Sequence, residues 1–257
     1  MKNKVLLISI DGMRPDGLLQ CGNPYVSELE KICAYTYSGS SVFPSVTLPC
    51  HFSMTHSVPP TRHGILTNTY VPQVRPVKGI FERIKEEKGK AAIFYGWEEL
   101  RDIALPGTCK YATYVNALAV ENGDNILADE CEKIIDTYKP DFAFLYMVET
   151  DEKGGHGNGW MSEAYKACIA NAINNVKRMI EKYGNEYRVI IMADHGGHDR
   201  MHGTEMPEDM TVPFFFYGPE FTPGEIKKPV SLLEIAPTIA ALLGIAPDED
   251  WEGYSLV

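Results

Sequence analysis

The stretch Val5-Leu6-Leu7-Ile8-Ser9-Ile10, which is followed by Asp11-Gly12, gives the first indication of the fold. A nearly continuous run of branched apolar residues is typical of a parallel strand buried on both faces, and Asp-Gly marks the start of a loop. Four more short apolar runs bounded by charged, Gly or Pro residues predict further strands, at 91–95, 142–148, 189–193 and 212–217. Apolar residues at helical spacing predict helices between them, at 25–34, 77–87, 126–138, 162–183 and 232–243.

This alternation predicts an α/β fold, a three-layer α/β/α sandwich around a mostly parallel sheet. In such sheets ligands bind outside the carboxyl ends of the strands. The 257 residues contain no repeat, low-complexity tract or linker, so we expect a single catalytic domain over residues 1–257.

Composition narrows the classes of partner. The 35 acidic and 24 basic residues give a formal net charge of -11, which argues against non-specific binding to a nucleic acid backbone. The six cysteines form no Cys-x-x-Cys pair, which predicts neither a zinc ribbon nor a disulfide framework and favours reduced thiols in the cytoplasm. No apolar run approaches the roughly 20 residues of a membrane span, and no signal-peptide cleavage site follows the first residues. We therefore expect a cytoplasmic protein that does not bind membranes.

Residues suited to binding metal follow three of the predicted strands. Asp11 follows the first strand, Asp151 comes shortly after 142–148, and Asp194-His195 follow 189–193. His198 and His202 come next. Carboxylate oxygens with imidazole nitrogens suit zinc, and also manganese or iron, far better than calcium.

Each of these residues also has a plainer interpretation. An aspartate at the end of a strand, such as Asp11, is often a helix cap or a turn former. His198 could be a ligand or a partner that orients one. Because no carboxylate or strand end accompanies His51, His56 and His63, we expect these three to be structural.

A possible nucleophile lies at Thr47. Pro49 fits the first turn of a helix, which places Thr47 at the helix N-terminus, where free N–H groups favour an anion. A metal-coordinated hydroxyl at that point could act as a nucleophile, although this segment taken alone favours an ordinary N-cap role for Thr47. The Pro-rich stretch 59–76 lacks periodicity and is expected to form a loop across the site.

Several motifs together resemble the nucleotide pyrophosphatase/phosphodiesterases of the alkaline phosphatase superfamily. The motifs occur in the order of that family, and a C-terminal segment is similar to the closing helix of the superfamily. They are Ile10-Asp11-Gly12, Phe43-Pro44-Ser45-Val46-Thr47-Leu48-Pro49, Arg62-His63-Gly64-Ile65, Asn68, Asp194-His195-Gly196, Ile235-Ala236-Pro237-Thr238-Ile239 and Leu242-Leu243-Gly244.

The resemblance implies an alkaline-phosphatase-like fold and two divalent metal ions, zinc in the first instance and manganese or iron as alternatives. Thr47 would attack phosphorus to give a phosphothreonine intermediate, which water then hydrolyses, and Asn68 would bind a non-bridging phosphate oxygen. The substrate would be a small phosphate ester or a nucleotide. By position, Asp11, Thr47, Asp194 and His195 would hold one ion, and Asp151, His156 and His202 the other.

One spacing departs from the family. The second-site aspartate and histidine are four residues apart in the family, whereas Asp151 and His156 are five apart here. Glu152 would restore the spacing of four. We favour Asp151, because Gly154-Gly155 could absorb one extra residue as a bulge in a loop, and the choice between the two carboxylates stays open.

Several other functions are alternatives to phosphodiester hydrolysis. A phosphomonoesterase or phosphonate hydrolase could use the same core, and a metal-dependent mutase would need a capping domain for which we find no sequence. A sulfatase would need a Cys-x-Pro-x-Arg pattern, which Cys50 does not begin. A non-enzymatic metal-binding protein is a further alternative, but a purely structural metal site would need no nucleophile.

Trp160 and Tyr70 could stack on a nucleobase, although packing is the simpler role for both. Monoester specialists of the superfamily typically place an arginine after the nucleophile; Leu48 and Pro49 follow Thr47 here, which favours diesters or pyrophosphates.

Overall fold

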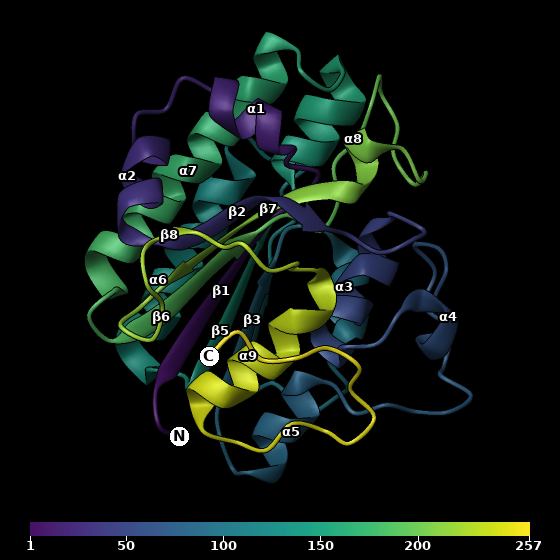
Figure 1. Cartoon of the computed structure of the whole chain (residues 1–257), viewed down its shortest axis with the longest axis vertical. Helices are drawn as coiled ribbons and strands as arrows, with labels where there is room; N and C mark the ends of the chain where they lie inside the picture. Colours follow the sequence, from purple (N-terminus) through teal and green to yellow (C-terminus); the bar gives the residue numbers. More distant parts are fainter.

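The computed structural model describes residues 1–257 and is built around one eight-stranded sheet with the order β4-β3-β5-β1-β6-β7-β2-β8 (Figure 1). Only β7 runs antiparallel to its two neighbours; the other five pairings are parallel. The mostly parallel sheet predicted from the sequence is therefore confirmed. The strands are β1 (Lys4–Ile10), β2 (Ala34–Ser40), β3 (Ala91–Tyr95), β4 (Tyr111–Tyr114), β5 (Phe142–Met147), β6 (Tyr187–Met192), β7 (Thr211–Tyr217) and β8 (Gly224–Glu225).

Helices cover both faces of the sheet (Figure 1). One face carries α1 (Pro15–Gln20), α2 (Tyr25–Ile32), α6 (Gly123–Tyr138) and α7 (Glu163–Tyr183). The opposite face carries α3 (Thr47–His56), α5 (Ile80–Glu86) and α9 (Ile235–Leu243). The shorter helical segments are α4 (Pro60–His63), α8 (Pro207–Met210), the 3₁₀ turns η1 (Glu98–Ile103) and η3 (Leu232–Glu234), and the π-helix η2 (Thr150–His156). None of the helices combines the length and the apolar character needed to cross a bilayer.

Three strands were not predicted. The helix expected at 25–34 ends at Ile32, and β2 begins two residues later. Ala34, Thr36 and Gly39 are buried in β2, which pairs with β7 through a register shift between Thr36 and Gly39. The edge strands β4 and β8 are short and partly exposed, so neither carries a buried apolar run. The helix expected at 232–243 is divided into η3 and α9.

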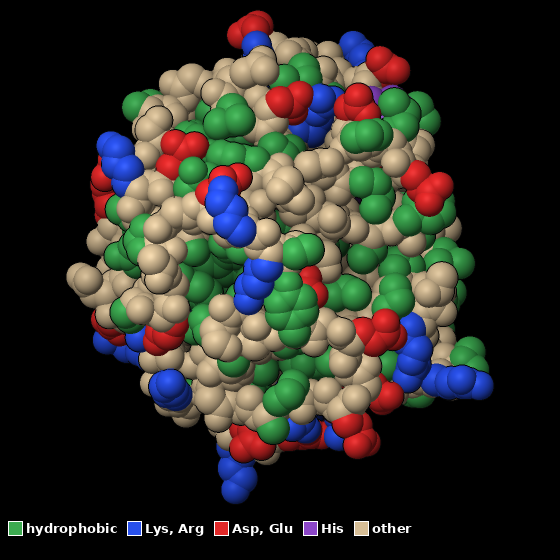
Figure 2. Space-filling model, viewed as in Figure 1, with side chains coloured by type: hydrophobic (Ala, Val, Ile, Leu, Met, Phe, Trp, Pro, Cys, Tyr) green, Lys and Arg blue, Asp and Glu red, His purple; other side chains and the backbone are tan.

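The register of the central strands brings the predicted metal-binding residues together. Within β1, Ile10 pairs with Met147 of β5, and Ser9 pairs with Met192 of β6. The three strands thus end at one edge of the sheet, where the chain continues into Asp11, Asp151 and Asp194. All six cysteines are free thiols. Acidic and basic side chains are interspersed over the face shown in Figure 2.

Candidate active site

Two ligand groups lie at this edge and share one histidine. Asp11, Asp194 and His195 offer ligand atoms within 4.8 Å of one another, and so do Asp151, His195 and His202. His195 Nε2 lies 3.3 Å from Asp11 Oδ1 and 3.4 Å from Asp194 Oδ2. These residues come from the segments that follow three different strands, so the sheet itself fixes their relative positions.

His156 extends the second group. Its Nε2 lies 3.4 Å from Asp151 Oδ2, while His202 Nε2 lies 3.9 Å from Asp151 Oδ1. The two imidazole rings are 5.1 Å apart between centroids. All the residues assigned to the second ion by resemblance are thus neighbours.

All three histidines present the same ring nitrogen to the carboxylates. The Nδ1 atoms of His156, His195 and His202 each lie 2.8 Å from a backbone carbonyl, of Arg200, Gly196 and Ser45 respectively. Because a carbonyl oxygen only accepts, Nδ1 carries the proton and Nε2 has its lone pair free. This outer hydrogen bond is the arrangement that commonly orients a metal-binding histidine.

The electrostatics of the cluster fit bound cations. Asp11 Oδ1, Asp151 Oδ1 and Asp194 Oδ2 are buried without a hydrogen-bond partner. Burial and neighbouring carboxylates raise the pKa values of Asp11 and Asp151 well above the ordinary range. Burial, reinforced by the nearby His195, lowers the pKa of His202 to about 3, so this imidazole is neutral. Without a cation, buried carboxylates that face the lone pairs of neutral imidazole nitrogens are unfavourable. Divalent cations would accept electron pairs from both the carboxylate oxygens and these nitrogens.

Thr47 is the first residue of α3, and its hydroxyl faces the first ligand group. Its Oγ1 lies 3.1 Å from His195 Nε2, and Thr47 is buried. The N-cap position belongs to Val46, which makes no side-chain cap, so the N-cap interpretation of Thr47 is wrong. Asn68 Oδ1 accepts a hydrogen bond of 3.0 Å from the N–H of Leu48, which leaves the amide NH₂ of Asn68 available at the helix N-terminus.

The extra residue between Asp151 and His156 is accommodated in η2. We expected a bulge in a loop; that expectation is wrong, because the residues form a π-helix, in which the i→i+5 pattern brings Asp151 and His156 to one face. The N–H of Gly157 donates to the carbonyl of Glu152 in this pattern. Close packing excludes a side chain at Gly155, where a Cβ would lie 2.6 Å from the Trp160 ring, and leaves little room at Gly154, where one would lie 3.0 Å from Tyr165. The geometry favours Asp151 over Glu152, since only Asp151 approaches the two histidines.

Two residues at the site were missed by the motif analysis. His51, expected to be merely structural, is fully buried with Nδ1 2.8 Å from the carbonyl of Thr47 and 3.4 Å from Asp194 Oδ2. The hydroxyl of Tyr146 donates to Asp11 Oδ2. Tyr146 is the one residue with a polar group in the otherwise apolar strand β5, and it lies next to the last residue of that strand, so its contact with Asp11 had a signal in the sequence. The contact of His51 depends on how α3 packs against the sheet, which no local pattern reveals.

The other candidates have structural partners. His198 Nδ1 lies 2.7 Å from Asp209 Oδ1, which connects the loop after β6 to α8. This contact helps to hold the loop that contains Asp194, His195 and His202. Trp160 is buried and donates from Nε1 to the carbonyl of Gly12 at 3.0 Å, which leaves no exposed face for a nucleobase. Tyr70 packs on Phe52 and lines a cavity of about 520 Å³ beside β3.

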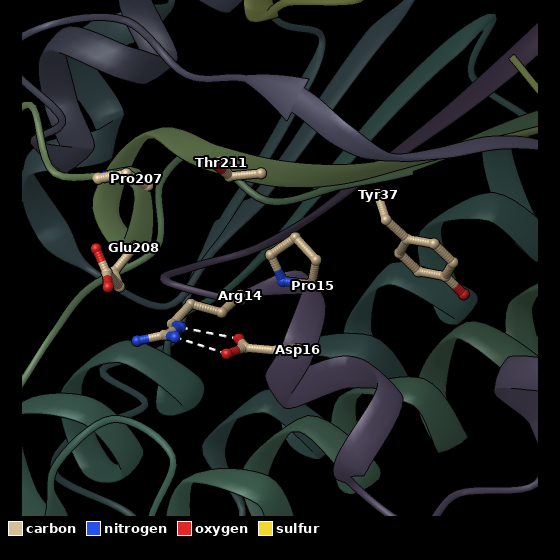
Figure 3. A pocket seen from close by; sticks show the side chains of 7 residues that line it. All are labelled: Arg14, Pro15, Asp16, Tyr37, Pro207, Glu208 and Thr211. Atoms are coloured by element: carbon tan, nitrogen blue, oxygen red, sulfur yellow. Dashed lines mark hydrogen bonds and ion pairs between the residues drawn. The ribbon is translucent and has the colours of Figure 1, made fainter. Parts of the chain in front are cut away.

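Two arginines that follow Asp11 and precede Asn68 in sequence are engaged elsewhere. Figure 3 shows Arg14 in a separate cavity of about 280 Å³, directed at Asp16. Its Nε and Nη2 donate to Asp16 at 2.9 and 2.6 Å, and its Nη1 donates to the carbonyl of Gly197 at 2.9 Å. Arg62 donates to the carbonyl of Arg75 and pairs with Asp250. Both guanidinium groups are therefore occupied.

Comparison with known families gives two matches that together cover most of the chain. Residues 5–99 match the family of type I phosphodiesterases / nucleotide pyrophosphatases, and residues 109–247 match the metalloenzyme superfamily. The first match contains Asp11, Thr47 and Asn68; the second contains the ligand candidates from Asp151 onward.

Individual relatives agree with these matches. Ectonucleotide pyrophosphatase/phosphodiesterase family member 1 of Rattus norvegicus is 27% identical over 218 residues, which cover 74% of this chain and 24% of that protein. Phosphopentomutase of Pectobacterium carotovorum is 25% identical over 201 residues, covering 77% of this chain and 44% of that enzyme. The chain thus spans less than half the length of either relative.

A solved structure has the same fold. Murine ectonucleotide pyrophosphatase/phosphodiesterase 5, in an inactive threonine-to-alanine form in complex with AMP, superposes with a TM-score of 0.81. It is 14% identical, and the superposition covers 95% of this chain and 96% of that chain.

Proposed function

Because this chain belongs to the metalloenzyme superfamily and has the alkaline-phosphatase-like fold, we propose that it hydrolyses phosphodiesters or nucleotide pyrophosphates with Thr47 as nucleophile. The observation that carries the proposal is the Thr47 hydroxyl at the start of α3, 3.1 Å from His195 and beside the two ligand groups. We further propose that residues 1–257 act as one catalytic unit, since every assigned residue lies at one edge of a single sheet.

The residues divide into two ligand sets. Asp11, Thr47, Asp194 and His195 would hold one divalent cation, and Asp151, His156 and His202 the other, with zinc, manganese or iron matching the oxygen and nitrogen donors. When bound, such cations lower the pKa of a coordinated hydroxyl or water and neutralise charge on a phosphate.

The chain's own groups then account for two displacements at phosphorus. In the first, Thr47 Oγ1 forms a bond to phosphorus while the bond to the leaving alcohol or phosphate breaks. This gives a phosphothreonine that still carries the other ester group of the substrate, and the proton of the hydroxyl neutralises the leaving group. In the second, water forms a bond to phosphorus, the bond to Thr47 Oγ1 breaks, and a proton returns to Thr47. The Asn68 amide, held through Leu48, would donate to a non-bridging oxygen throughout.

Charge at the phosphate favours diesters over monoesters. Leu48 follows Thr47, and the guanidinium groups of Arg14 and Arg62 are held by other partners. A neutral amide suits the single negative charge of a diester, whereas a dianionic monoester presents one more charged oxygen, which neither Leu48 nor the engaged Arg14 and Arg62 would receive.

The relatives support this choice of substrate class. The match over residues 5–99 is to phosphodiesterases and nucleotide pyrophosphatases, and the AMP in the murine structure is a nucleotide, the class of product that such substrates release. A phosphomonoesterase or phosphonate hydrolase on the same core remains the alternative function. The likeness to phosphopentomutase is confined to less than half of that enzyme.

The test uses metal-depleted protein reloaded separately with zinc, manganese or iron. Each form is assayed on a nucleoside p-nitrophenyl phosphodiester, a nucleotide pyrophosphate, an aryl phosphate monoester and an aryl phosphonate monoester. We expect hydrolysis of the first two only after metal is restored. Metal binding without turnover of any of the four would refute the proposal and favour a non-enzymatic metal-binding protein.

A further inference from the structure

The two residues before η2, Val148 and Glu149, are joined to the start of α6 by reciprocal hydrogen bonds. Asp124, in the first turn of α6, accepts from the N–H of Val148 at 3.0 Å through Oδ1 and from the N–H of Glu149 at 3.1 Å through Oδ2. In return, Glu149 Oε1 accepts from the N–H of Gly123 at 2.9 Å. Two helix starts therefore provide acceptors for each other's backbone.

Neither β5 nor η2 supplies acceptors for the N–H groups of Val148 and Glu149, so Asp124 takes that role. The N–H groups at the start of a helix have no acceptor within that helix, and β5 has already ended at Met147. Asp124 is only 2% exposed, so water cannot readily take its place. Leaving two buried N–H groups without acceptors would be strongly unfavourable.

The surrounding residues restrain the joint further. Lys153 Nζ donates to Glu149 Oε1 at 2.5 Å and to the carbonyl of Val120 at 2.9 Å, which links η2 to the loop before α6. A Cβ on Gly123 would lie 2.4 Å from Cα of Ala117, so only glycine lets this loop and the start of α6 approach so closely.

The π-helical register makes this joint important for Asp151, which lies two residues beyond Glu149. In an ordinary α-helix, residues five apart point about 140° away from each other, since each step turns by about 100°. Asp151 and His156 could not then share one ion. The π-helix keeps His156 Nε2 3.4 Å from Asp151 Oδ2, and such a register is seldom stable without support from its surroundings.

We infer that Asp124 is a positioning residue for the second metal site: by holding the two residues that lead into η2, it fixes Asp151 in line with His156 and His202. The inference rests on the proposed function only in requiring that this site bind a divalent cation. It assigns Asp124 no contact with substrate.

The test is a zinc titration of metal-depleted protein, read by equilibrium binding. Asp124→Asn keeps the shape of the side chain but turns an NH₂ group toward one of the two backbone N–H groups, and Asp124→Ala removes both acceptors. We expect affinity at the second site to fall by about tenfold to a hundredfold in the Asn variant and further in the Ala variant, with the other site little changed. Asp141→Asn is the matched control, because Asp141 also accepts a backbone N–H, from Lys90 at 2.8 Å, but at the start of β5, the opposite end of the strand.

A double-mutant cycle separates positioning from general stability. In an Asp151→Ala background, where the second site is already lost, Asp124→Asn should no longer change zinc binding. Equal weakening of both sites, or an unchanged second site in both Asp124 variants, would overturn the inference. Zinc binding can be measured without turnover. A protein that is inactive but still shows this pattern would therefore refute the proposed reaction and leave the role of Asp124 standing. A wild-type protein that binds only one zinc ion would refute the two-ion site.

Discussion

Replacing Thr47 by alanine should abolish turnover while leaving the fold intact. The change removes the oxygen that accepts the phosphoryl group, and we expect kcat/KM to fall at least about a thousandfold, equivalent to roughly 4 kcal/mol of transition-state stabilisation. The structural cost is small, because the hydroxyl contacts His195 and does not cap α3. One hydrogen bond and one buried methyl group amount to about 1–2 kcal/mol, or a decrease in Tm of roughly 2–8 °C for a chain of this size.

The assay compares kcat/KM on a nucleoside p-nitrophenyl phosphodiester with thermal unfolding under the same metal loading. Thr47→Ser should keep much of the activity, because the hydroxyl remains. Thr55→Ala is the matched control: Thr55 is buried two turns further along α3 and donates to the carbonyl of His51 at 2.7 Å. It should lose similar stability but retain turnover. Near wild-type kcat/KM in Thr47→Ala would refute the assignment of the nucleophile.

Three further predictions concern the ligand choice, the substrate and the pH dependence of stability. Asp151→Ala should lose one equivalent of bound metal and most activity, whereas Glu152→Ala should be mild; the reverse pattern in metal analysis would transfer the ligand role to Glu152. With equal metal loading, kcat/KM should be about tenfold to a thousandfold higher for the phosphodiester than for p-nitrophenyl phosphate, and equal or better monoester hydrolysis would indicate a cationic side chain at the phosphate. Burial lowers the pKa of His63 to about 4 from 6.5, so its contribution to stability is complete above pH 6.5 and is lost as the pH falls toward 4. Between pH 7.5 and pH 5, the free energy of unfolding measured in urea should therefore decrease by about 2 kcal/mol less in His63→Gln than in wild type. An identical decrease in both proteins would contradict this.

The parts of the fold that could be predicted are those with strong local patterns. The apolar run at 5–10 is buried on both faces of the sheet, and this is why it was recognisable as a central parallel strand. The short edge strand β4 has no buried residue, so its sequence resembles that of a loop. β2 depends on pairing with β7, a partner more than 170 residues away, and local sequence does not reveal such pairing.

The same distinction applies to the site. Asp11, Asp194 and His195 stand directly at strand ends, where residue type and position together indicate function. The five-residue spacing of Asp151 and His156 was noticed, but the π-helix that accommodates it is stabilised by packing of Gly154 and Gly155 against aromatic rings supplied later in the chain. Tertiary contacts of this kind leave no periodic signal in the sequence.

The most direct test of the proposed mechanism is the stereochemical outcome at phosphorus. A nucleoside phosphorothioate diester of one configuration is hydrolysed in ¹⁸O-labelled water by the metal-loaded protein, and the configuration of the product is determined by ³¹P NMR. Each in-line displacement inverts phosphorus, so attack by Thr47 followed by attack of water predicts overall retention. Overall inversion would mean that water attacks the diester in a single step, and would contradict the phosphothreonine intermediate.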